Sequence, residues 1–520
     1  MSDESTHPLP PLPPGFDRNS VEALSKLAWK LIDARRHPEA IACLQEVTQL
    51  APAFVEAWAN LSSLLLFGGK AEQAVTCYRQ AVGLEPANLD LRKALVRALR
   101  KANQRAVALS ECDVAIQHGA DDTEIHLQRG NLLQELGRFG EAVEHIQRAI
   151  ALAGRLPPML NDLGIAQLRG GQIEAAMSSF SEAISKQPDF ADAHYNLGTA
   201  LLLQGDYARG LPAYAWRRGE NGRPQNTAIL AGNIPRWTGQ ALAGKRVMLC
   251  SEQGVGDIIM FMSLLPAFLK ETSKLKESAG LGLVTTPRMK PFIDRDFPAL
   301  VGIYDTAAER PACQPYDYHL PLGDLMNCVL PHYTPADHPP YLTADVKRSN
   351  RLREQYLGYA HERGRTKLIG VSWHTTNPRV GPTRNIALSE FHPLFSLAGI
   401  QFVSLQYGDH AEEIAECNRR VGDILYHDSA IDAFNDLDGL AAQMSAMDQI
   451  VTIDNSTVHL AGALGRPTTL LLSAAPDWRW GLNGSGCRWY RSVCLERQET
   501  IFDWRPVIER VRSRLSANGA

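Results

Sequence analysis

The sequence predicts an α-helical repeat array over residues 21–224, followed by two doubly wound α/β lobes over residues 244–345 and 365–512. Three observations support this. A pattern of large and small apolar residues returns every 34 residues in the first part of the chain. Short apolar runs then alternate with helical stretches, and a polar, proline-bearing stretch at 331–364 separates two groups of such runs. At 520 residues the chain is too long for one hydrophobic core.

The repeat array is predicted from six windows of equal length. These begin at Val21, Val55, Leu89, Thr123, Pro157 and Ala191. In the second window the recurring positions hold Trp58, Leu61, Leu65, Ala74, Tyr78, Ala81 and Pro86. This pattern resembles the tetratricopeptide repeat (TPR), a pair of antiparallel helices in which small residues such as Ala74 let the backbones approach. The resemblance implies a curved solenoid of about six repeats whose concave face binds a peptide or protein segment. The alternative is a spacer or a dimerisation arm.

The two ends of the array depart from the pattern. Window one has Leu24 and Ala28 where Trp and Gly are usual, which suits a terminal cap. Window six departs at Gly210 and runs into Trp216-Arg217-Arg218, where we expect the array to meet another part of the chain. We predict that residues 1–20, which are rich in proline, are disordered.

Composition excludes several classes of protein. The formal net charge is -4, with 53 basic and 57 acidic residues, so no basic footprint for nucleic acid is visible. No apolar run approaches the roughly 20 residues that a transmembrane helix needs. The proline-rich start also lacks the basic and apolar parts of a secretory signal, so we expect a cytoplasmic protein.

The second half of the chain has a different period. Short apolar runs followed by helical stretches indicate buried parallel strands at 246–250, 281–285, 368–373, 401–405, 449–453 and 468–472. Strands that alternate with helices predict doubly wound sheets, which bind ligands at the carboxyl ends of their strands. Two such lobes would form a cleft.

The first lobe opens with a strand, a glycine-bearing loop and a helix. The loop reads Glu252-Gln253-Gly254-Val255-Gly256-Asp257. Gly254 and Gly256 allow a tight turn, and Asp257 either projects into the cleft or caps the helix that begins there. The loop is not the dinucleotide fingerprint, because Ile259 stands where that motif has its third glycine.

A polar turn in the second lobe follows the predicted strand 449–453. Asp454, Asn455, Ser456 and Thr457 can each cap a helix, and Ala461, Gly462 and Ala463 then let that helix lie close to the sheet. Its amino end should present free N–H groups and partial positive charge, which suit a diphosphate. Ser456 and Thr457 could add hydroxyl donors. His459 lies one turn further on, either as a ligand contact or as a packing residue.

Other segments of the second lobe could reach the same site. Trp373 ends one strand, Gln406 follows the next, and the loop between them brings Arg384, whose guanidinium could pair with phosphate oxygens. Arg384 could equally be a solvated loop residue. Trp478, Trp480 and Trp489 could stack on a base or sugar ring or could pack between the lobes.

Residues 244–512 resemble the GT-B glycosyltransferases related to the ADP-heptose:lipopolysaccharide heptosyltransferases. The loop 252–257 is similar to the first-lobe loop of that family, and residues 454–463 are similar to its donor-binding turn. With the repeats, the chain resembles bacterial TPR-containing glycosyltransferases, some of which modify flagellin. The resemblance implies two Rossmann-like lobes, an acceptor side at 244–345 and a donor side at 365–512. Asp257 would be the catalytic base, and Ser456, Thr457 and their neighbours would bind the donor phosphates.

The predicted activity is inverting, metal-independent transfer of a sugar from a nucleotide-sugar co-substrate, without a further cofactor. The acceptor would be a protein, flagellin-like or otherwise, held on the repeats. Asp294-Arg295-Asp296 spells the Asp-x-Asp that binds metal in other glycosyltransferases, but it lies away from both loops and is interpreted as a charged helix end. One alternative is a non-catalytic TPR scaffold with a degenerate nucleotide-binding module. Another is a small-molecule glycosyltransferase that uses its repeats for localisation.

Overall fold

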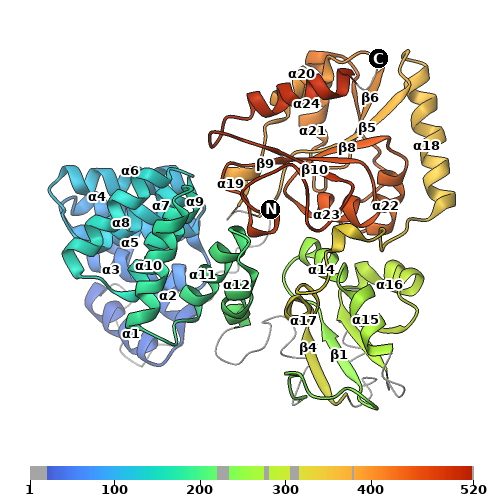
Figure 1. Cartoon of the computed structure of the whole chain (residues 1–520). Coiled ribbons are helices and arrows are strands. Elements are labelled where there is room, and N and C mark those ends of the chain that lie inside the picture. The colour runs from blue at the N-terminus through green and yellow to red at the C-terminus, as the bar shows by residue number, and fades with distance from the viewer. Residues whose placement is uncertain (1–19, 219–233, 274–279, 305–315, 378–379, 518–520) are drawn as a thin grey trace. The chain divides into compact units, whose positions relative to one another are not determined.

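The computed structural model describes residues 20–218, 234–273, 280–304, 316–377 and 380–517 (Figure 1). The chain divides into two compact units, residues 1–170 and 171–520. Residues 1–19, where we predict disorder, lie outside the described residues, as do residues 219–224 of the predicted repeat region.

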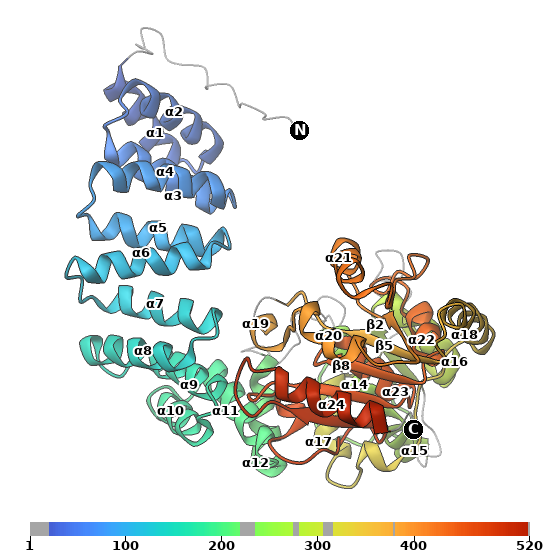
Figure 2. The same cartoon turned by 90° about the horizontal axis from the view of Figure 1, so that it is seen from above.

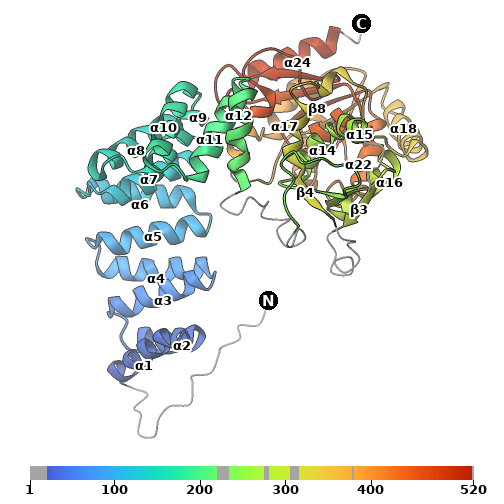
Figure 3. The same ribbon diagram turned by 60° about the horizontal axis from the view of Figure 1, so that its bottom comes forward.

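Antiparallel helix pairs build the first unit and follow one another along the array (Figures 2 and 3). The helices are α1 Val21–Asp33, α2 His37–Leu50, α3 Val55–Phe67, α4 Ala71–Leu84, α5 Leu89–Lys101, α6 Arg105–Gln117, α7 Thr123–Glu135, α8 Phe139–Ala153 and α9 Pro157–Arg169. The first helix of each pair begins at the first residue of a sequence window, so the predicted register is confirmed. One recurring small residue explains why the pattern fixes this register. It is Ala40, Ala74, Ala108 or Ala142 in the first four windows, and each of these alanines is 0% exposed where paired helices touch.

The second unit begins with the last helices of the array. These are α10 Ile173–Lys186, α11 Ala191–Leu203, α12 Tyr207–Tyr214 and the 3₁₀ turn η1 Ala215–Arg218. Helix α12 contains Pro212, which has no N–H for the helical hydrogen bond, and the chain tightens into η1 after Tyr214. The predicted departure of window six is therefore confirmed.

The first lobe is built on one parallel sheet. Among the described residues its strands run in the order β3-β2-β1-β4. Its elements are β1 Val247–Cys250, α14 Val255–Met262, α15 Leu265–Ser273, β2 Leu281–Thr285, η2 Pro287–Met289, α16 Lys290–Asp296, β3 Leu300–Tyr304, β4 Tyr318–Pro321, η4 Leu322–Asp324 and α17 Leu325–Val329. The turn η5 Pro335–Asp337 and helix α18 Val346–His361 lead to the second lobe.

A second parallel sheet follows, and its described strands run in the order β10-β9-β8-β5-β6-β7. Its elements are β5 Lys367–Ser372, α19 Gly381–Arg384, η6 Leu388–Phe391, α20 His392–Phe395, β6 Ile400–Ser404, α21 Ala411–Val421, β7 Leu425–Tyr426, α22 Leu437–Ser445, β8 Gln449–Ile453, α23 Ser456–Ala463, β9 Thr468–Leu472, η7 Trp478–Trp480, β10 Val493–Arg497 and α24 Arg505–Ala517. All six predicted strands are present within one residue of their expected bounds. A helical repeat array followed by parallel sheets and helices is therefore confirmed.

Each sheet has a point where the chain reverses its direction of winding. In the first lobe this point lies between β1 and β4, and in the second between β5 and β8. Doubly wound folds bind ligands beyond the carboxyl ends of strands at such switch points. The turns that follow β1 and β8 are therefore the places in the α/β region where a site is expected.

Candidate functional site

The turns after β1 and β8 face each other, because helices α14 and α23 pack together through their amino ends (Figure 1). Gly256 makes this approach possible. A Cβ atom at Gly256 would lie 2.9 Å from Cδ2 of His459 and 3.4 Å from Cα of Ser456. The two sequence motifs that resemble glycosyltransferase loops thus lie in direct contact.

Asp257 uses both of its carboxylate oxygens. Oδ2 accepts a hydrogen bond from the Gly254 N–H at 3.0 Å and caps α14. Oδ1 pairs with the guanidinium of Arg479, which comes from η7 in the second lobe. The capping role that the sequence left open is therefore observed, and the second oxygen points across the lobe boundary.

Arg479 begins a chain of alternating charges. Its guanidinium also pairs with Asp477. Arg384 lies 3.2 Å from Oδ2 of Asp477 and 3.1 Å from Oδ2 of Asp454, and it donates to the Asp454 carbonyl at 3.2 Å. All five side chains are largely buried, the most exposed being Asp477 at 21%. Arg384 is thus held by carboxylates and is not a solvated loop residue.

Burial and the two arginines shift the pKa values of these carboxylates in opposite directions. Burial raises the pKa of Asp454, and Arg384 offsets only part of the rise. Burial also acts to raise the pKa of Asp477, but Arg479 and Arg384 outweigh it, so that pKa is lowered. The pKa of Arg479 is raised despite its burial, because Asp257 and Asp477 stabilise its charge. Two fixed cations therefore lie beside the amino end of α23.

The amino end of α23 is capped from within. The Asn455 Oδ1 atom accepts from the Thr457 N–H at 2.9 Å, and its Nδ2 donates to Oγ of Ser372 at 2.9 Å. Thr457 is 1% exposed, and its hydroxyl donates to the same Ser372 oxygen at 3.4 Å. These two side chains face the end of β5, whereas Ser456 is half-buried at the surface of the turn.

His459 packs inside the protein as a neutral ring. Burial lowers its pKa to about 3, and the charge of Arg479 contributes. Its Nδ1 atom lies 3.0 Å from the Tyr490 hydroxyl, and its ring stacks on Trp480 at 5.3 Å between centroids. The packing role is therefore the one observed.

Two predicted ligand contacts face the protein interior. Gln406 Oε1 accepts from the main-chain N–H groups of Trp373 and His374 at 3.0 and 2.9 Å, and its Nε2 donates to carbonyl oxygens. Trp373 is 1% exposed, lies in the core of the second lobe and donates through Nε1 to Glu413 at 3.1 Å. The expectation that Trp373 and Gln406 face a ligand is corrected, because their polar groups form hydrogen bonds with other protein groups.

The tryptophan cluster also packs internally. Trp478, Trp480 and Trp489 are 4%, 4% and 1% exposed, and the rings of Trp478 and Trp489 meet edge to face at 6.0 Å. The rings therefore pack internally, on one another, on His459 and on Tyr214 of α12, and not between the two lobes as the second interpretation had it.

Sequence reasoning did not identify Arg479 or Asp477, which complete the charge chain. A tyrosine of the last repeat also lies near it. Burial raises the pKa of Tyr195 on α11, and the charges of Asp477, Arg479 and Asp257 act on the same hydroxyl. No local motif marks this role, because Asp257, the partner of Arg479 across the lobe boundary, is far away in the sequence.

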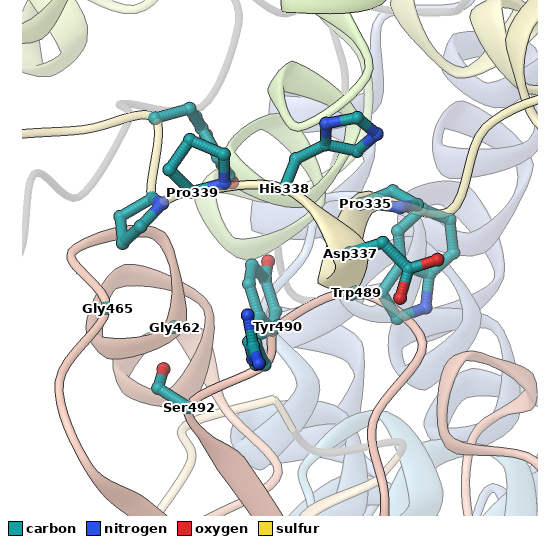
Figure 4. Close-up of a pocket in the computed structure, with 12 residues that line it drawn as sticks. Pro335, Asp337, His338, Pro339, Gly462, Gly465, Trp489, Tyr490 and Ser492 are labelled. Atoms are coloured by element: carbon teal, nitrogen blue, oxygen red, sulfur yellow. The ribbon is translucent and has the colours of Figure 1, made fainter.

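A cavity of about 460 Å³ lies at the opposite end of α23 (Figure 4). Its walls include the prolines of the lobe linker, Gly462, Gly465 and the ring of Tyr490. Figure 4 shows Pro335 and Pro339 on one side of it and Ser492 on the other. The cavity is separate from the charge chain, which lies at the amino end of the helix.

Asp294-Arg295-Asp296 forms the end of α16, as expected. Asp294 pairs with Lys290 at 2.9 Å, and Asp296 accepts from the Thr343 N–H and hydroxyl at 3.0 and 2.6 Å. Within the described ranges, no group of three or more His, Cys, Asp or Glu side chains is arranged to hold a metal ion. Nor does any helix in these ranges have the length and apolarity to cross a bilayer.

Comparison with known proteins establishes the repeats. The tetratricopeptide repeat family matches residues 55–88, 123–155 and 161–218. Tetratricopeptide repeats are therefore confirmed over these residues, ahead of the α/β region. The fragment of MamA from Desulfovibrio magneticus RS-1 that runs from residue 41 to the end is 17% identical, with a TM-score of 0.31, over 33% of this chain and 95% of the fragment. YrrB, described as a TPR protein with an unusual peptide-binding site, is 18% identical with a TM-score of 0.30, over 36% of this chain and 95% of YrrB.

Two sequence relatives have curated names. Protein FlbA of Caulobacter vibrioides is 29% identical over 441 residues, which are 81% of this chain and 72% of FlbA. An alignment of that length includes part of the α/β region as well as the repeats. The human protein O-mannosyl-transferase TMTC1 is 25% identical over 158 residues, which are 30% of this chain and only 18% of TMTC1.

Proposed function

We propose that the chain is a glycosyltransferase of the GT-B type, inverting and independent of metal, which moves a sugar from a nucleotide-sugar to a protein segment held by the TPR array. One observation carries the proposal. Asp257, at the switch point of the first sheet, contacts Arg479 beside the switch-point turn of the second sheet. A carboxylate that can act as a base is thus opposite a helix amino end flanked by two arginines.

The donor diphosphate would bind at the amino end of α23. The partial positive charge there favours an anion, and Arg384 and Arg479 can pair with phosphate oxygens. Ser456 is the half-buried hydroxyl of the turn and would add a donor. These groups would stabilise the charge that develops on the leaving nucleoside diphosphate.

Donor binding would also release the base. Phosphate oxygens compete with Asp257 for the Arg479 guanidinium, so a bound diphosphate frees Oδ1 of Asp257. The acceptor hydroxyl then transfers its proton to Asp257, and its oxygen bonds to the anomeric carbon. The bond from that carbon to the diphosphate breaks on the opposite side, which inverts the anomeric configuration.

A protein acceptor is supported by two findings. TPR arrays bind peptide and protein segments on their concave faces. The partial relative TMTC1 is named as a protein O-mannosyl-transferase, although the alignment covers a small part of it.

The test uses the full chain and a panel of nucleotide-sugars. We expect at least one of them to raise the thermal stability, because a ligand at 100 times its Kd adds about 2.7 kcal/mol. That donor should be hydrolysed slowly in the presence of EDTA. Asp257→Asn should keep the thermal shift and lose about 10²- to 10⁴-fold of the turnover. Asp294→Asn is the matched control, because this exposed carboxylate lies on α16, and its turnover should equal that of the unchanged protein.

The rival scaffold predicts a different result. A degenerate module would give no turnover with any nucleotide-sugar, and Asp257→Asn would then have no turnover to remove. Equal turnover in Asp257→Asn and in the unchanged protein would reject the assigned base. A turnover that is lost with EDTA and restored by a divalent cation would reject the metal-independent mechanism.

A further inference from the structure

Arg217 is a buried charged residue at a position where the other repeats have a small apolar residue. The equivalent position of the five earlier windows holds a small apolar residue that is at most 3% exposed; these residues are Val47, Ala81, Ala115, Ala149 and Ala183. In the sixth window the same position holds Arg217, whose side chain is 5% exposed. A buried charge is costly unless it is paired. Arg217 must therefore have partners outside the repeat.

Those partners lie at the switch point of the first lobe. The Arg217 guanidinium binds Glu252 through two nitrogens, Nε to Oε2 at 3.0 Å and Nη2 to Oε1 at 2.5 Å. Nη2 also lies 2.9 Å from Oδ1 of Asp324. Glu252 follows β1 and Asp324 follows β4, and their side chains are 5% and 2% exposed. The last repeat thus joins the two loops that border the switch point.

Tyr214 makes a second connection, and it reaches both lobes. Its hydroxyl accepts from Nε2 of Gln253 at 3.0 Å. Its ring contacts that of Trp478 at 5.2 Å between centroids, next to Arg479. Gln253 has a φ of 63°, a left-handed conformation that a non-glycine residue adopts only at a cost. The Tyr214 hydrogen bond helps to hold this residue, which directly precedes the Gly254 N–H that Asp257 caps.

We infer that the sixth repeat is part of the site, and that Tyr214 and Arg217 are positioning residues for the loop 252–257. They act on Asp257 through Gln253 and Glu252. The effect of Tyr214 and Arg217 on catalysis rests on the proposed function. Their effect on the conformation of the loop 252–257 does not. The repeat that ends the TPR array and the loop that carries the proposed base would therefore move together.

Hydrogen exchange of the full chain tests this without a substrate. Tyr214→Phe removes the hydroxyl and keeps the ring that packs on Trp478. Loss of one hydrogen bond of about 1 kcal/mol corresponds to a roughly fivefold increase in local opening, so exchange in residues 251–258 should be about fivefold faster. Exchange in α23 should not change. Tyr207→Phe is the matched control on the same helix, since the Tyr207 ring lies 4.4 Å from the Arg488 guanidinium, and it should leave residues 251–258 unchanged.

A second variant covers a possible failure of the first. Glu252→Gln keeps the shape of the side chain and removes the charge that faces Arg217, and it should also increase exchange in residues 251–258. Unchanged exchange in both variants would overturn the inference, whether or not the protein turns over a nucleotide-sugar. Faster exchange in a protein without turnover would support the positioning role and count against the proposed function alone. Where turnover is found, Tyr214→Phe should lower kcat per folded molecule and leave the donor KM unchanged. Because a loss of folded protein also lowers the apparent kcat at constant KM, the folded fraction is measured alongside.

Discussion

Asp454 and Asp477 bind the same guanidinium, yet the protein shifts their pKa values in opposite directions. Asp477 touches both arginines, and their charges depress its pKa. Asp454 touches only Arg384 of the two, and its burial dominates, so its pKa is raised. A carboxylate whose pKa is lower in the folded than in the unfolded protein adds to the free energy of unfolding when the pH is above its pKa in the unfolded protein. This contribution is lost as the pH falls through its pKa in the folded protein. A carboxyl group whose pKa is higher in the folded protein adds to the free energy of unfolding when the pH is below its pKa in the unfolded protein. This contribution is lost as the pH rises through its pKa in the folded protein.

This difference predicts opposite effects for two similar substitutions. At pH 7, Asp477→Asn should lower the free energy of unfolding by about 1–3 kcal/mol, because it removes an ionised acceptor from two arginines. Asp454→Asn should leave the stability unchanged or raise it, because asparagine removes the cost of burying an ionised carboxylate, which is the largest cause of the raised Asp454 pKa. Urea unfolding at pH 7 and again near pH 3 measures both, and the Asp477→Asn loss should shrink at the lower pH. A larger loss for Asp454→Asn than for Asp477→Asn would contradict the assignment.

Single residues could be predicted from the sequence where a local motif fixes their place. Asp257 and Asn455 lie at helix starts after strands, and both are found there. Arg479 could not be predicted, because its partner Asp257 is distant in the chain. The sequence places Gln406 at a strand end. It does not predict the direction of the Gln406 amide, because that direction depends on the neighbouring strand.

At the scale of elements, contact between α14 and α23 depends on one missing side chain. Gly256→Ala would place a methyl group 2.9 Å from the His459 ring. This overpacking should cost about 1–3 kcal/mol of stability and separate the two turns. Gly254→Ala is the matched control, because its Cβ would meet Oδ2 of Asp257 only at 3.5 Å and its φ is −85°. Thermal unfolding should show a clear loss for the first variant and little change for the second. Equal stability would show that the helices do not meet at Gly256.

Strands were predictable from the sequence when they lie inside a sheet and are apolar. β1, β5 and β8 are of this kind. Polar residues interrupt the apolar pattern of other strands, as His319 does in β4 and Glu496 does in β10. In β10 only Val493 and Leu495 are buried. β7 has only two residues, Leu425 and Tyr426, too few for a periodic pattern.

For the whole molecule, the position of a truncation should decide whether the α/β region folds. Deletion of residues 1–156 ends between repeats and keeps Tyr214 and Arg217. Deletion of residues 1–220 removes both and leaves the buried carboxylate of Glu252 without its guanidinium, which should cost about 3–5 kcal/mol. Expression and thermal unfolding of the two shortened proteins measure this. Equal stability of the two would show that the sixth repeat is dispensable for the lobes.

The same pair of truncations separates two roles of the array. If the repeats only localise the enzyme, the protein that lacks residues 1–156 should glycosylate its acceptor at the full rate. If they hold the acceptor, transfer to protein should fall while hydrolysis of the donor continues. The 34-residue period predicted the array itself from sequence. It did not predict that the compact units divide at Gly170, because the pattern of windows continues through that point.

The register of the array has an evolutionary consequence. Each window begins at the first residue of a helix, so duplication or loss of a 34-residue block ahead of Pro157 leaves every bond of Arg217 in place. Descendants of such a gene can gain or lose repeats in steps of 34 residues while the contacts between the sixth repeat and the first lobe stay the same. The number of repeats can thus change without changing how the array is attached to the first lobe.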